Sequence, residues 1–431
     1  MILTVPYYRL TERTVALESA FAEHLRLFRR TFLPVFDEFV VALVEMTTED
    51  YEKKMSSFAV LSEIEDGVIV ESLCGSVEQN DRWPKRMAKF YLGQFFPFCK
   101  KIFKLVKQAD VILTGPSDIT TIPLFLVSLL GIFLKKPVGF VVDIDFRNSI
   151  VMDFKSGETT WKSYLLRRYI YDKLTLLKIA FLIKINCLAL LKGKKMCEDY
   201  GKGRDNVKNF LDAAYSKEHI ISPADLENKM INAGYGNNAL EVVYFGRLVS
   251  YKAIDYCIRA VWHAQKKTTR KITFHIFGSG DQDRFLKKMV QDLEMKNSVI
   301  FHGDASYGKK LFEQLYPCHL LLATPLREDT PRSALDAMAA GIPILAFDTY
   351  YYKDLAETGA VATVPWPSIE QMGDKIAEMN DNRNILVEMM PKAVAFAHGN
   401  TQEIWLNRRL QWTKELMEKK NYKKQMRFKK K

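Results

Sequence analysis

Residues 320–346 read LLLATPLREDTPRSALDAMAAGIPILA. The run Leu320–Ala323 is apolar throughout and predicts a buried strand. Thr330 is a good helix cap and Pro331 suits the first helical position, so a helix is expected to begin here. Gly341 ends that helix, and the apolar residues after it start a second strand. The order strand, helix, strand is typical of a unit with parallel strands.

The same alternation of short apolar runs and helical patterns extends through both halves of the chain. It predicts the α/β class, with two Rossmann-like, doubly wound domains that face a cleft. Strands are expected at Ile2–Val5, Phe39–Leu43, Val68–Glu71, Val111–Thr114, Val138–Val142, Cys187–Leu190, Glu241–Phe245, Ile272–Phe277, Val299–His302, Leu320–Ala323, Ile342–Ala346 and Val361–Val364. Helices are expected at Val15–Arg30, Trp83–Lys107, Thr120–Phe133, Ile254–Lys266, Asp283–Leu293, Lys309–Tyr316, Pro331–Ala340 and Ile369–Met379.

A Gly- and Asn-rich stretch at 228–239 interrupts this periodicity and marks the expected domain boundary. The chain is therefore expected to divide into a domain over 1–235, a domain over 236–400, and a terminal helix with a basic tail over 401–431. A cleft between two such domains is the expected ligand site.

The composition is that of a folded protein with a basic surplus. Of 431 residues, 48% are hydrophobic, and the formal net charge is +12. The six cysteines show no C-x-x-C pair and no zinc-finger spacing, which favours free thiols in a reducing compartment. No secretory leader precedes the first strand, so a cytoplasmic location is expected.

The basic surplus gathers toward the C-terminus, where residues 401–431 carry 11 basic and 3 acidic residues. The segment 419–431 is either a solvated tail, a contact with an anionic membrane surface, or a nucleic-acid contact. Nucleic acid ranks last, because no binding motif for it accompanies the charge. Residues 161–184 mix apolar and basic side chains, as a helix on a membrane surface or a two-sided core helix does. The uncharged run 119–134 is too short to span a bilayer and is expected to be a buried helix.

Two acids bracket the start of the helix at Pro331. Backbone N–H groups in its first turn, at Arg332 and Ser333, form an anion site with the helix dipole. Glu328 lies before the helix and Asp336 inside it, where they can reach the two ends of a nucleotide sugar. The alternative is a capped helix with a surface acid at each end.

A second loop adds cations at the same sheet edge. The segment Phe245–Lys252 reads FGRLVSYK, which places Arg247 and Lys252 between a strand and the next helix. Ligands of doubly wound sheets bind beyond the carboxyl ends of the strands. The pair can therefore neutralise a diphosphate without a metal ion.

With these motifs in order, the second half resembles the nucleotide-binding domain of the GT-B glycosyltransferases, specifically the retaining family 4. The matching features are G-R-x(4)-K at Gly246–Lys252, a Gly turn at Phe277–Gly280, V-x-F-x-G at Val299–Gly303, and E-x7-E with A-M-A-x-G-x-P at Glu328–Pro343. The resemblance covers roughly 240–395 well, and 1–235 only as a pattern of strands and helices. The terminal helix resembles the one that crosses back to the first domain in that fold.

The resemblance implies a role for each position. Arg247 and Lys252 would hold the donor diphosphate, Arg332 and Ser333 the distal phosphate, Glu328 the transferred sugar and Asp336 the ribose. Catalysis would rest on positioning and electrostatic stabilisation, with retained configuration and no metal or other cofactor. The expected donor-binding set is Gly246, Arg247, Lys252, Gly278, Gly280, Glu328, Thr330, Pro331, Arg332, Ser333 and Asp336. The expected catalytic set is Glu328, Arg247, Lys252 and Asp145.

Three departures from the family pattern stand out. Asp336 is one methylene shorter than the usual Glu, Asp329 stands where Gly is common, and His319 replaces a common acid. The first domain lacks the usual Gly-rich first loop and the His after its middle strand. Acceptor contacts are expected instead at Tyr8, Arg9, Asp143 and Arg147. The alternative is that these four are ordinary turn residues without a role in binding.

The sequence thus predicts a retaining glycosyltransferase in surface polysaccharide biosynthesis. Its donor would be a nucleotide sugar, with UDP favoured over GDP, and its acceptor a glycan or a lipid-linked saccharide. It would work in the cytoplasm, at the inner face of the membrane through 161–184 and 419–431. The alternatives are an epimerase on the same fold, or a protein that binds a sugar nucleotide without transferring the sugar.

Overall fold

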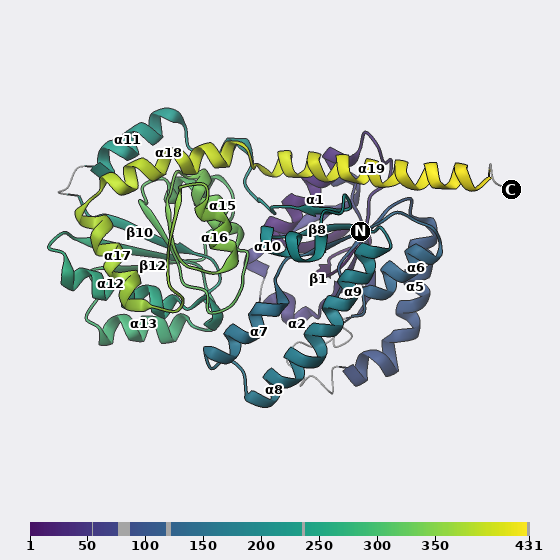
Figure 1. Cartoon of the computed structure of the whole chain (residues 1–431), viewed down its shortest axis with the longest axis horizontal. Helices are drawn as coiled ribbons and strands as arrows, with labels where there is room; N and C mark the ends of the chain where they lie inside the picture. Colours follow the sequence, from purple (N-terminus) through teal and green to yellow (C-terminus); the bar gives the residue numbers. More distant parts are fainter. Residues whose placement is uncertain (54, 76–86, 118–121, 235–237, 429–431) are drawn as a thin grey trace. The chain divides into compact units, whose positions relative to one another are not determined.

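The computed structural model describes residues 1–428 apart from 54, 76–86, 118–121 and 235–237, with side chains described as far as Lys419 apart from that of residue 56. Its contacts divide the chain into two compact units. The first comprises Met1–Asp143, Tyr169–Phe210 and the chain from Trp405 onward; the second comprises Ile144–Arg168 and Leu211–Ile404. Figure 1 shows both units, each with strands between layers of helices.

The first unit contains two sheets. Strand β1 (Ile2–Arg9) pairs in parallel with β3 (Val40–Glu45), which pairs with β5 (Ile69–Cys74). The end of β1 also pairs antiparallel with β2 (Thr14–Glu18), and β2 pairs with β4 (Phe58–Ser62). The second sheet is parallel, with the order β6 (Ile112–Thr114), β7 (Val138–Val142), β8 (Leu188–Leu191) and β9 (Val207–Asn209), and β6 lies beside β1.

The longer helices of the first unit connect these strands. They are α1 (Ser19–Phe32), α5 (Phe95–Gln108) after the π-helical turn η2 (Phe90–Gln94), α6 (Phe125–Phe133), α9 (Asp172–Lys184) and the terminal α19 (Gln402–Phe428). Short turns are α2 (Thr48–Glu52), η1 (Met55–Ser57), α3 (Glu63–Asp66), α10 (Lys194–Met196) and η4 (Cys197–Gly201). Leu406 and Leu410 of α19 are buried in the core that α1 shares with β1 and β3. The terminal helix is therefore part of this unit's core.

The second unit is a six-stranded parallel sheet. Its strands are β10 (Leu240–Phe245), β11 (Ile272–Phe277), β12 (Val299–Gly303), β13 (Leu320–Ala323), β14 (Ile344–Phe347) and β15 (Val361–Val364). The spatial order is β12-β11-β10-β13-β14-β15, so the direction of winding reverses between β10 and β13. Central strands such as β13 and β14 are buried on both faces, which is why they read as unbroken apolar runs.

Helices cover both faces of this sheet. They are α11 (Pro223–Gly234), α12 (Ile254–Lys267), α13 (Asp283–Asp292), α14 (Lys309–Leu315), α15 (Arg332–Ala339), α16 (Tyr350–Ala356), α17 (Ile369–Asp381) and α18 (Asn384–His398), with short turns η5 (Lys217–His219) and η6 (Ser250–Lys252). The unit also includes α7 (Phe146–Lys155) and α8 (Trp161–Leu166), while the π-helical turn η3 (Arg167–Tyr171) crosses the division between units.

All twelve predicted strands are present within two residues at most of their predicted ends, except that β1 continues to Arg9 and β5 to Cys74. The helix predicted at Val15–Arg30 is wrong at its start, because Val15–Glu18 pairs with two strands as part of β2. The helix predicted from Pro331 begins at Arg332. The predicted helices Trp83–Lys107 and Thr120–Phe133 and the uncharged run 119–134 include residues 83–86 and 119–121, which lie outside the described residues. In the described part of the chain, no helix combines the length and apolar character needed to cross a bilayer.

Candidate functional site

The carboxyl end of β10 leads into the loop that carries both predicted cations. Gly246 has φ +141°, a conformation that L side chains rarely adopt, and its N–H donates to the Phe277 carbonyl across to β11 (3.0 Å). The Leu248 N–H donates to the Ser279 carbonyl (2.9 Å), which holds the two loops together. A Cβ on Gly278 would lie 2.0 Å from the Gly246 oxygen, so this turn has a structural need for glycine that is independent of any ligand.

Gly280 is under the same constraint. A Cβ there would lie 2.1 Å from the Leu248 oxygen. Of the predicted donor-binding glycines, Gly278 and Gly280 thus serve the close approach of two loops, and Gly246 serves a backbone turn. Their part in holding a donor stays a prediction.

Arg247 is exposed at the start of this loop, and a hydrogen bond to Tyr251 orients it. Its Nη2 donates to the hydroxyl of Tyr251 (3.2 Å), while the guanidinium of Arg327 lies 3.7 Å from the centre of the same ring. The Leu326 N–H donates to the Tyr251 carbonyl (2.8 Å). The loops that follow β10 and β13 therefore meet at the point where the winding reverses, which is where doubly wound sheets bind ligands.

Lys252 does not point into open solvent. Its ammonium forms an ion pair with the carboxylate of Asp329, and each side chain is only 16% exposed. Asp329 also accepts from the N–H of Thr330 (3.0 Å). These groups line a small cavity together with Pro331 and Ser333. Lys252, which is predicted to bind the diphosphate, is thus already paired with an anion, Asp329.

The start of α15 closes this edge. Pro331 is the capping residue, with extended ψ of 134°, and the helix begins at Arg332. Thr330, the predicted cap, therefore lies outside the helix, one position before the observed cap, and its N–H donates to the side chain of Asp329. The Pro331 carbonyl accepts from the hydroxyl of Tyr351 (3.3 Å). The backbone N–H groups of Arg332 and Ser333 belong to the first turn, as the anion-site prediction requires.

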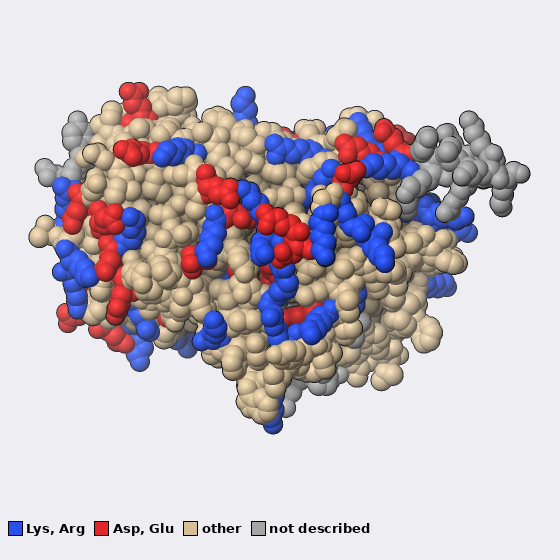
Figure 2. All heavy atoms as spheres, viewed as in Figure 1, with Lys and Arg blue, Asp and Glu red and all other residues tan. Residues whose placement is uncertain are grey.

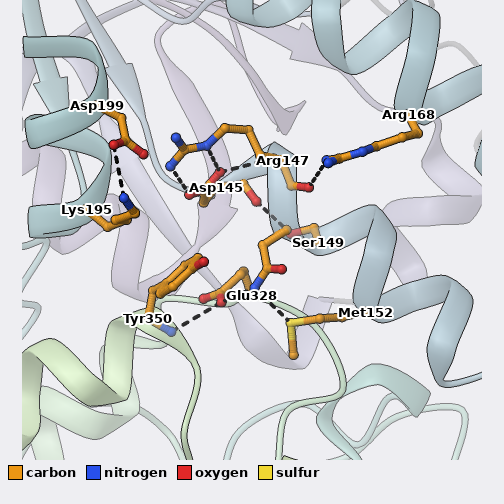
Figure 3. A network of polar contacts seen from close by, with 10 residues as sticks. Asp145, Arg147, Ser149, Met152, Arg168, Lys195, Asp199, Glu328 and Tyr350 are labelled. Atoms are coloured by element: carbon orange, nitrogen blue, oxygen red, sulfur yellow. Dashed lines mark hydrogen bonds and ion pairs between the residues drawn. The ribbon is translucent and has the colours of Figure 1, made fainter.

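Glu328 is an enclosed acid of the site, at 4% exposure. Its Oε1 accepts from Nδ2 of Asn148 (2.8 Å) and from the N–H of Tyr350 (3.2 Å), as Figure 3 shows for the carboxylate and Tyr350. Burial raises the pKa of this carboxyl, and the hydrogen bonds from Asn148 and Tyr350 oppose that rise. The side chain is thereby fixed in one orientation before any ligand binds.

Asn148 comes from α7, whose start holds two further predicted residues. Asp145 caps this helix by accepting from the N–H of Arg147 (3.0 Å) and also from its Nε (2.9 Å). Asp145 lies close enough to Glu328 to contribute to the raised pKa of Glu328. The segment 144–168 belongs to the second unit, so the structure brings Asp145 and Arg147 together with Glu328 (Figure 3).

Asp336 faces inward from α15 and is 3% exposed. Its Oδ1 accepts from the hydroxyl of Tyr307 (3.0 Å). Burial raises its pKa to about 7, against the opposing effects of Tyr307 and Arg332. The carboxyl therefore changes its charge near neutral pH, which an exposed aspartate does not do.

The other predicted acceptor residues lie in the first unit, each with its own partners. Tyr8 stacks on Tyr51 with ring centres 4.2 Å apart, and its hydroxyl bonds to Thr48 (3.2 Å). Arg9 donates to the Val70 carbonyl (2.8 Å) and to the Tyr7 hydroxyl (3.1 Å). Asp143, 57% exposed, pairs with the buried Lys192 at 3.5 Å. Their acceptor role stays a prediction.

Sequence reasoning missed three residues that shape the site. They are Asn148, Tyr307 and Tyr350, which hold Glu328 or Asp336. A partial signal existed for Asn148, because Asp145 is a strong helix cap after a strand and directs the next residues to the sheet edge. Among the described residues, no group of three or more His, Cys, Asp or Glu side chains is arranged to hold a metal ion.

Comparison with known proteins is consistent with this site. Residues 228–395 match the family model described as Glycosyl transferases group 1. A poly(ribitol-phosphate) alpha-N-acetylglucosaminyltransferase of Staphylococcus aureus is 27% identical over 204 residues, 44% of this chain and 41% of that protein. The GtfA subunit of a UDP-N-acetylglucosamine–peptide N-acetylglucosaminyltransferase of Streptococcus pneumoniae is 25% identical over 132 residues, 31% of this chain and 25% of that protein. The chain thus spans less than half the length of these curated relatives.

A solved structure matches nearly the whole chain. HepE of Anabaena in complex with UDP superposes with a TM-score of 0.61 at 15% identity, covering 96% of this chain and 99% of that one. The chain has the GT-B fold, with two Rossmann-like α/β units. The match to the family of group 1 glycosyl transferases is confined to residues 228–395, and the solved structure shows the fold.

Proposed function

We propose that the chain is a retaining glycosyltransferase that moves a sugar from a UDP-sugar to a glycan or lipid-linked saccharide in surface polysaccharide synthesis. The observation that carries the proposal is the meeting of the β10 and β13 loops at the reversal of the sheet. There Arg247 and Lys252, Glu328 and the first turn of α15 occupy one edge. This edge lies within the segment that matches the family model.

The residues divide the work as follows. Arg247 and Lys252 stabilise the diphosphate as it leaves, and the N–H groups of Arg332 and Ser333 bind its distal phosphate. Two side-chain cations in these positions supply the charge that a metal ion supplies elsewhere, so no metal is required in this proposal. Asp336 accepts from the ribose hydroxyls in its ionised form.

Glu328 accepts hydrogen bonds from the hydroxyls of the transferred sugar. Asn148 and the Tyr350 N–H occupy one of its oxygens, which leaves the carboxylate oriented for the sugar. Asp145, at the start of the same helix as Asn148, is the candidate to position the acceptor hydroxyl. Pre-oriented groups of this kind lower the barrier because they need no reorganisation during the reaction.

The choice of donor rests on the relatives. HepE is bound to UDP, and the pneumococcal GtfA is named for a UDP-N-acetylglucosamine donor. These names favour UDP over GDP and an N-acetylhexosamine or hexose as the sugar. The staphylococcal relative acts on a poly(ribitol-phosphate), which favours a surface polymer as acceptor. The proposed place of action is the cytoplasmic face of a membrane.

The test is calorimetric binding of UDP and GDP, followed by release of UDP from a panel of UDP-sugars with mass analysis of the products. We expect selective binding of UDP and slow release from one conjugate, which Glu328→Gln abolishes. The matched control is Glu227→Gln, an exposed carboxylate on α11 that contacts none of these groups. Failure of the folded protein to bind either nucleotide would contradict the proposal.

One observation favours a second candidate, a protein that binds a sugar nucleotide without transferring the sugar. The ion pair between Lys252 and Asp329 engages a cation that the transfer reaction needs. Binding of UDP-sugar with no release and no product, in the presence of membrane lipid extracts, would select this candidate. Conversion of one UDP-sugar to another without any acceptor would instead select an epimerase.

A further inference from the structure

Helix α9 of the first unit has an unusual outer face. Ile170, at the turn before it, and Leu174, Leu177 and Phe181 follow one another at spacings of four, three and four residues, which places them in one row. Their exposed fractions are 50%, 42%, 65% and 46%. The opposite face buries Asp172 and Thr175. The row that faces outward is therefore more apolar than folding of this unit requires.

Helix α5 and the π-helical turn η2 before it repeat the pattern. Leu92, Phe96 and Phe103 lie four and seven residues apart, and thus in one row, with exposed fractions of 87%, 80% and 48%. Helix α6 adds Phe133 at its end, 79% exposed. Large apolar side chains scattered singly over a surface are ordinary, but rows of them on successive helices mark an interaction site.

The three helices form one surface. The ring of Phe125 on α6 contacts the ring of Phe181 on α9, with centres 6.4 Å apart, and α5 packs against α6. Figure 1 shows α9, α6 and α5 side by side in the first unit. We call the outward rows of these helices, together with Phe133, the apolar face.

The exposed charged side chains of α5, α6 and α9 are all basic. The helices α5 and α6 contain no Asp or Glu, and the single acid of α9, Asp172, is buried. Lysines flank the rows, at positions 100, 104 and 107 on α5 and at 173, 178 and 184 on α9. Figure 2 shows a largely uncharged surface over these helices with basic groups at its margins. Lys178 lies 5.8 Å from the ring of Phe125, so basic and aromatic groups alternate across the surface.

This charge distinguishes between possible occupants. A second copy of the chain would bring the same face against itself in a two-fold dimer and set these lysines against one another. A bilayer with anionic lipids accepts apolar side chains below its headgroups and attracts lysines at their level.

We propose that the apolar face of α5, α6 and α9 docks the first unit on the surface of a bilayer that contains anionic lipids. This interaction site does not depend on the proposed reaction. It refines the sequence prediction for 161–184, because only 169–184 belongs to this unit. The basic tail at 419–431 is a separate element that the experiment below tests separately.

The test is flotation of the full chain with vesicles of phosphatidylcholine, with and without phosphatidylglycerol. We expect binding to the anionic vesicles and a decrease of at least about tenfold in the partition coefficient for Leu177→Gln/Phe181→Gln. The matched control is Ile231→Gln/Phe285→Gln, which replaces two equally exposed apolar side chains of the second unit. Lys173→Gln/Lys178→Gln should weaken binding to anionic vesicles and remove most of its salt dependence.

Three outcomes would overturn the proposal. One is no binding of the wild type to anionic vesicles. Another is equal binding of wild type and Leu177→Gln/Phe181→Gln, with binding lost only when the tail after Lys419 is deleted. The third is a dimer in sedimentation velocity that this double variant dissociates, because the face would then belong to a second copy. Calorimetric UDP binding, measured on the same variants, is expected to stay unchanged and separates this test from that of the proposed function.

Discussion

The two units of the chain bury and expose opposite kinds of side chain. In the second unit, carboxyls that water would solvate well are enclosed at the edge of the sheet, as Glu328 and Asp336 are. In the first unit, the polar candidates Arg9 and Asp143 have ordinary partners, and large apolar side chains stand exposed in rows on α5 and α9. Buried carboxyls and exposed apolar rows both lower the stability of the isolated chain. Such features concentrate where a protein binds its ligands.

Under the two proposals above, the units have separate tasks. Enclosed acids beside cations suit a nucleotide sugar, whose charges and hydroxyls replace the missing water. Exposed apolar rows beside lysines suit a lipid surface. A transferase that takes its acceptor from a membrane requires both, on separate parts of the chain.

The largest expected effect concerns Asp336. Its pKa of about 7 in the folded chain exceeds the ordinary aspartate value of 3.8, so folding stability is lost as pH rises from about 4 to 7. The contribution is about 4 kcal/mol at most, because each pKa unit corresponds to about 1.4 kcal/mol. Asp336→Asn should remove this loss and be more stable than the wild type above pH 7.

Urea denaturation of wild type and variant below pH 4 and above pH 7 measures this effect. Asp37→Asn, at an exposed aspartate of the first unit, is the matched comparison and should change stability by less than about 0.5 kcal/mol. If the stability of the wild type and of Asp336→Asn depended on pH in the same way, burial of Asp336 would not affect folding stability. The contrast between the two units would then not hold at this residue.

The next effect tests the contact between the loops after β10 and β11. Gly280→Ala would place a methyl group 2.1 Å from the Leu248 oxygen, so backbone must move. We expect a loss of about 3 kcal/mol in the free energy of unfolding, with weaker UDP binding, measured by denaturation and calorimetry. Gly93→Ala, where a Cβ meets nothing within 4 Å and φ is not positive, as at Gly280, measures the effect of an added methyl group without a close contact. A similar loss for both variants would show that the close approach is not what requires glycine.

Arg247→Ala comes third. Because Arg247 is exposed and its guanidinium donates to the hydroxyl of Tyr251, its removal should leave stability unchanged and lower kcat/KM about 100-fold. The control is Arg259→Ala, a similarly accessible arginine on α12 whose side chain is 48% exposed. Steady-state release of UDP measures both. Equal activities would mean that Arg247 has no part in stabilising the diphosphate.

The sequence predicts the second unit better than the first for physical reasons. Its central strands, such as β13 and β14, are buried on both faces and read as apolar runs, so their positions follow from hydrophobicity alone. The strands missed in the first unit are β2, β4 and β9, which are edge or hairpin strands stabilised by pairing partners distant in the sequence. Thr14–Glu18 has a helical pattern after it and no local signal that it pairs with β1 and β4.

The site shows the same limit. Its charged residues follow from strand ends and helix caps, which are local. The partners do not: Asn148 lies 180 residues from Glu328, and Tyr307 lies 29 from Asp336. The ion pair of Lys252 with Asp329 joins two loops that only the sheet order brings together. Such contacts follow from tertiary packing and carry no periodic signal.

The ion pair between Lys252 and Asp329 gives the smallest expected effect. Asp329 holds Lys252 in the position where a diphosphate would need it, so the carboxylate and the phosphates compete for one ammonium. Asp329→Asn removes the competing charge and keeps the side-chain volume. Since both groups are partly exposed, the pair is worth about 1 kcal/mol, and we expect UDP to bind about fivefold to tenfold more tightly.

Calorimetry at low and high salt measures this gain, which should shrink as salt screens the charges. Asp348→Asn, which breaks the ion pair with Lys353 at 3.0 Å, is the matched control and should leave UDP affinity unchanged. In Lys252→Ala/Asp329→Asn the gain should vanish, because the carboxylate acts only through this lysine. Weaker UDP binding by Asp329→Asn would instead mean that Asp329 orients Lys252 for the phosphates, and the second unit would then hold its cation ready for the ligand.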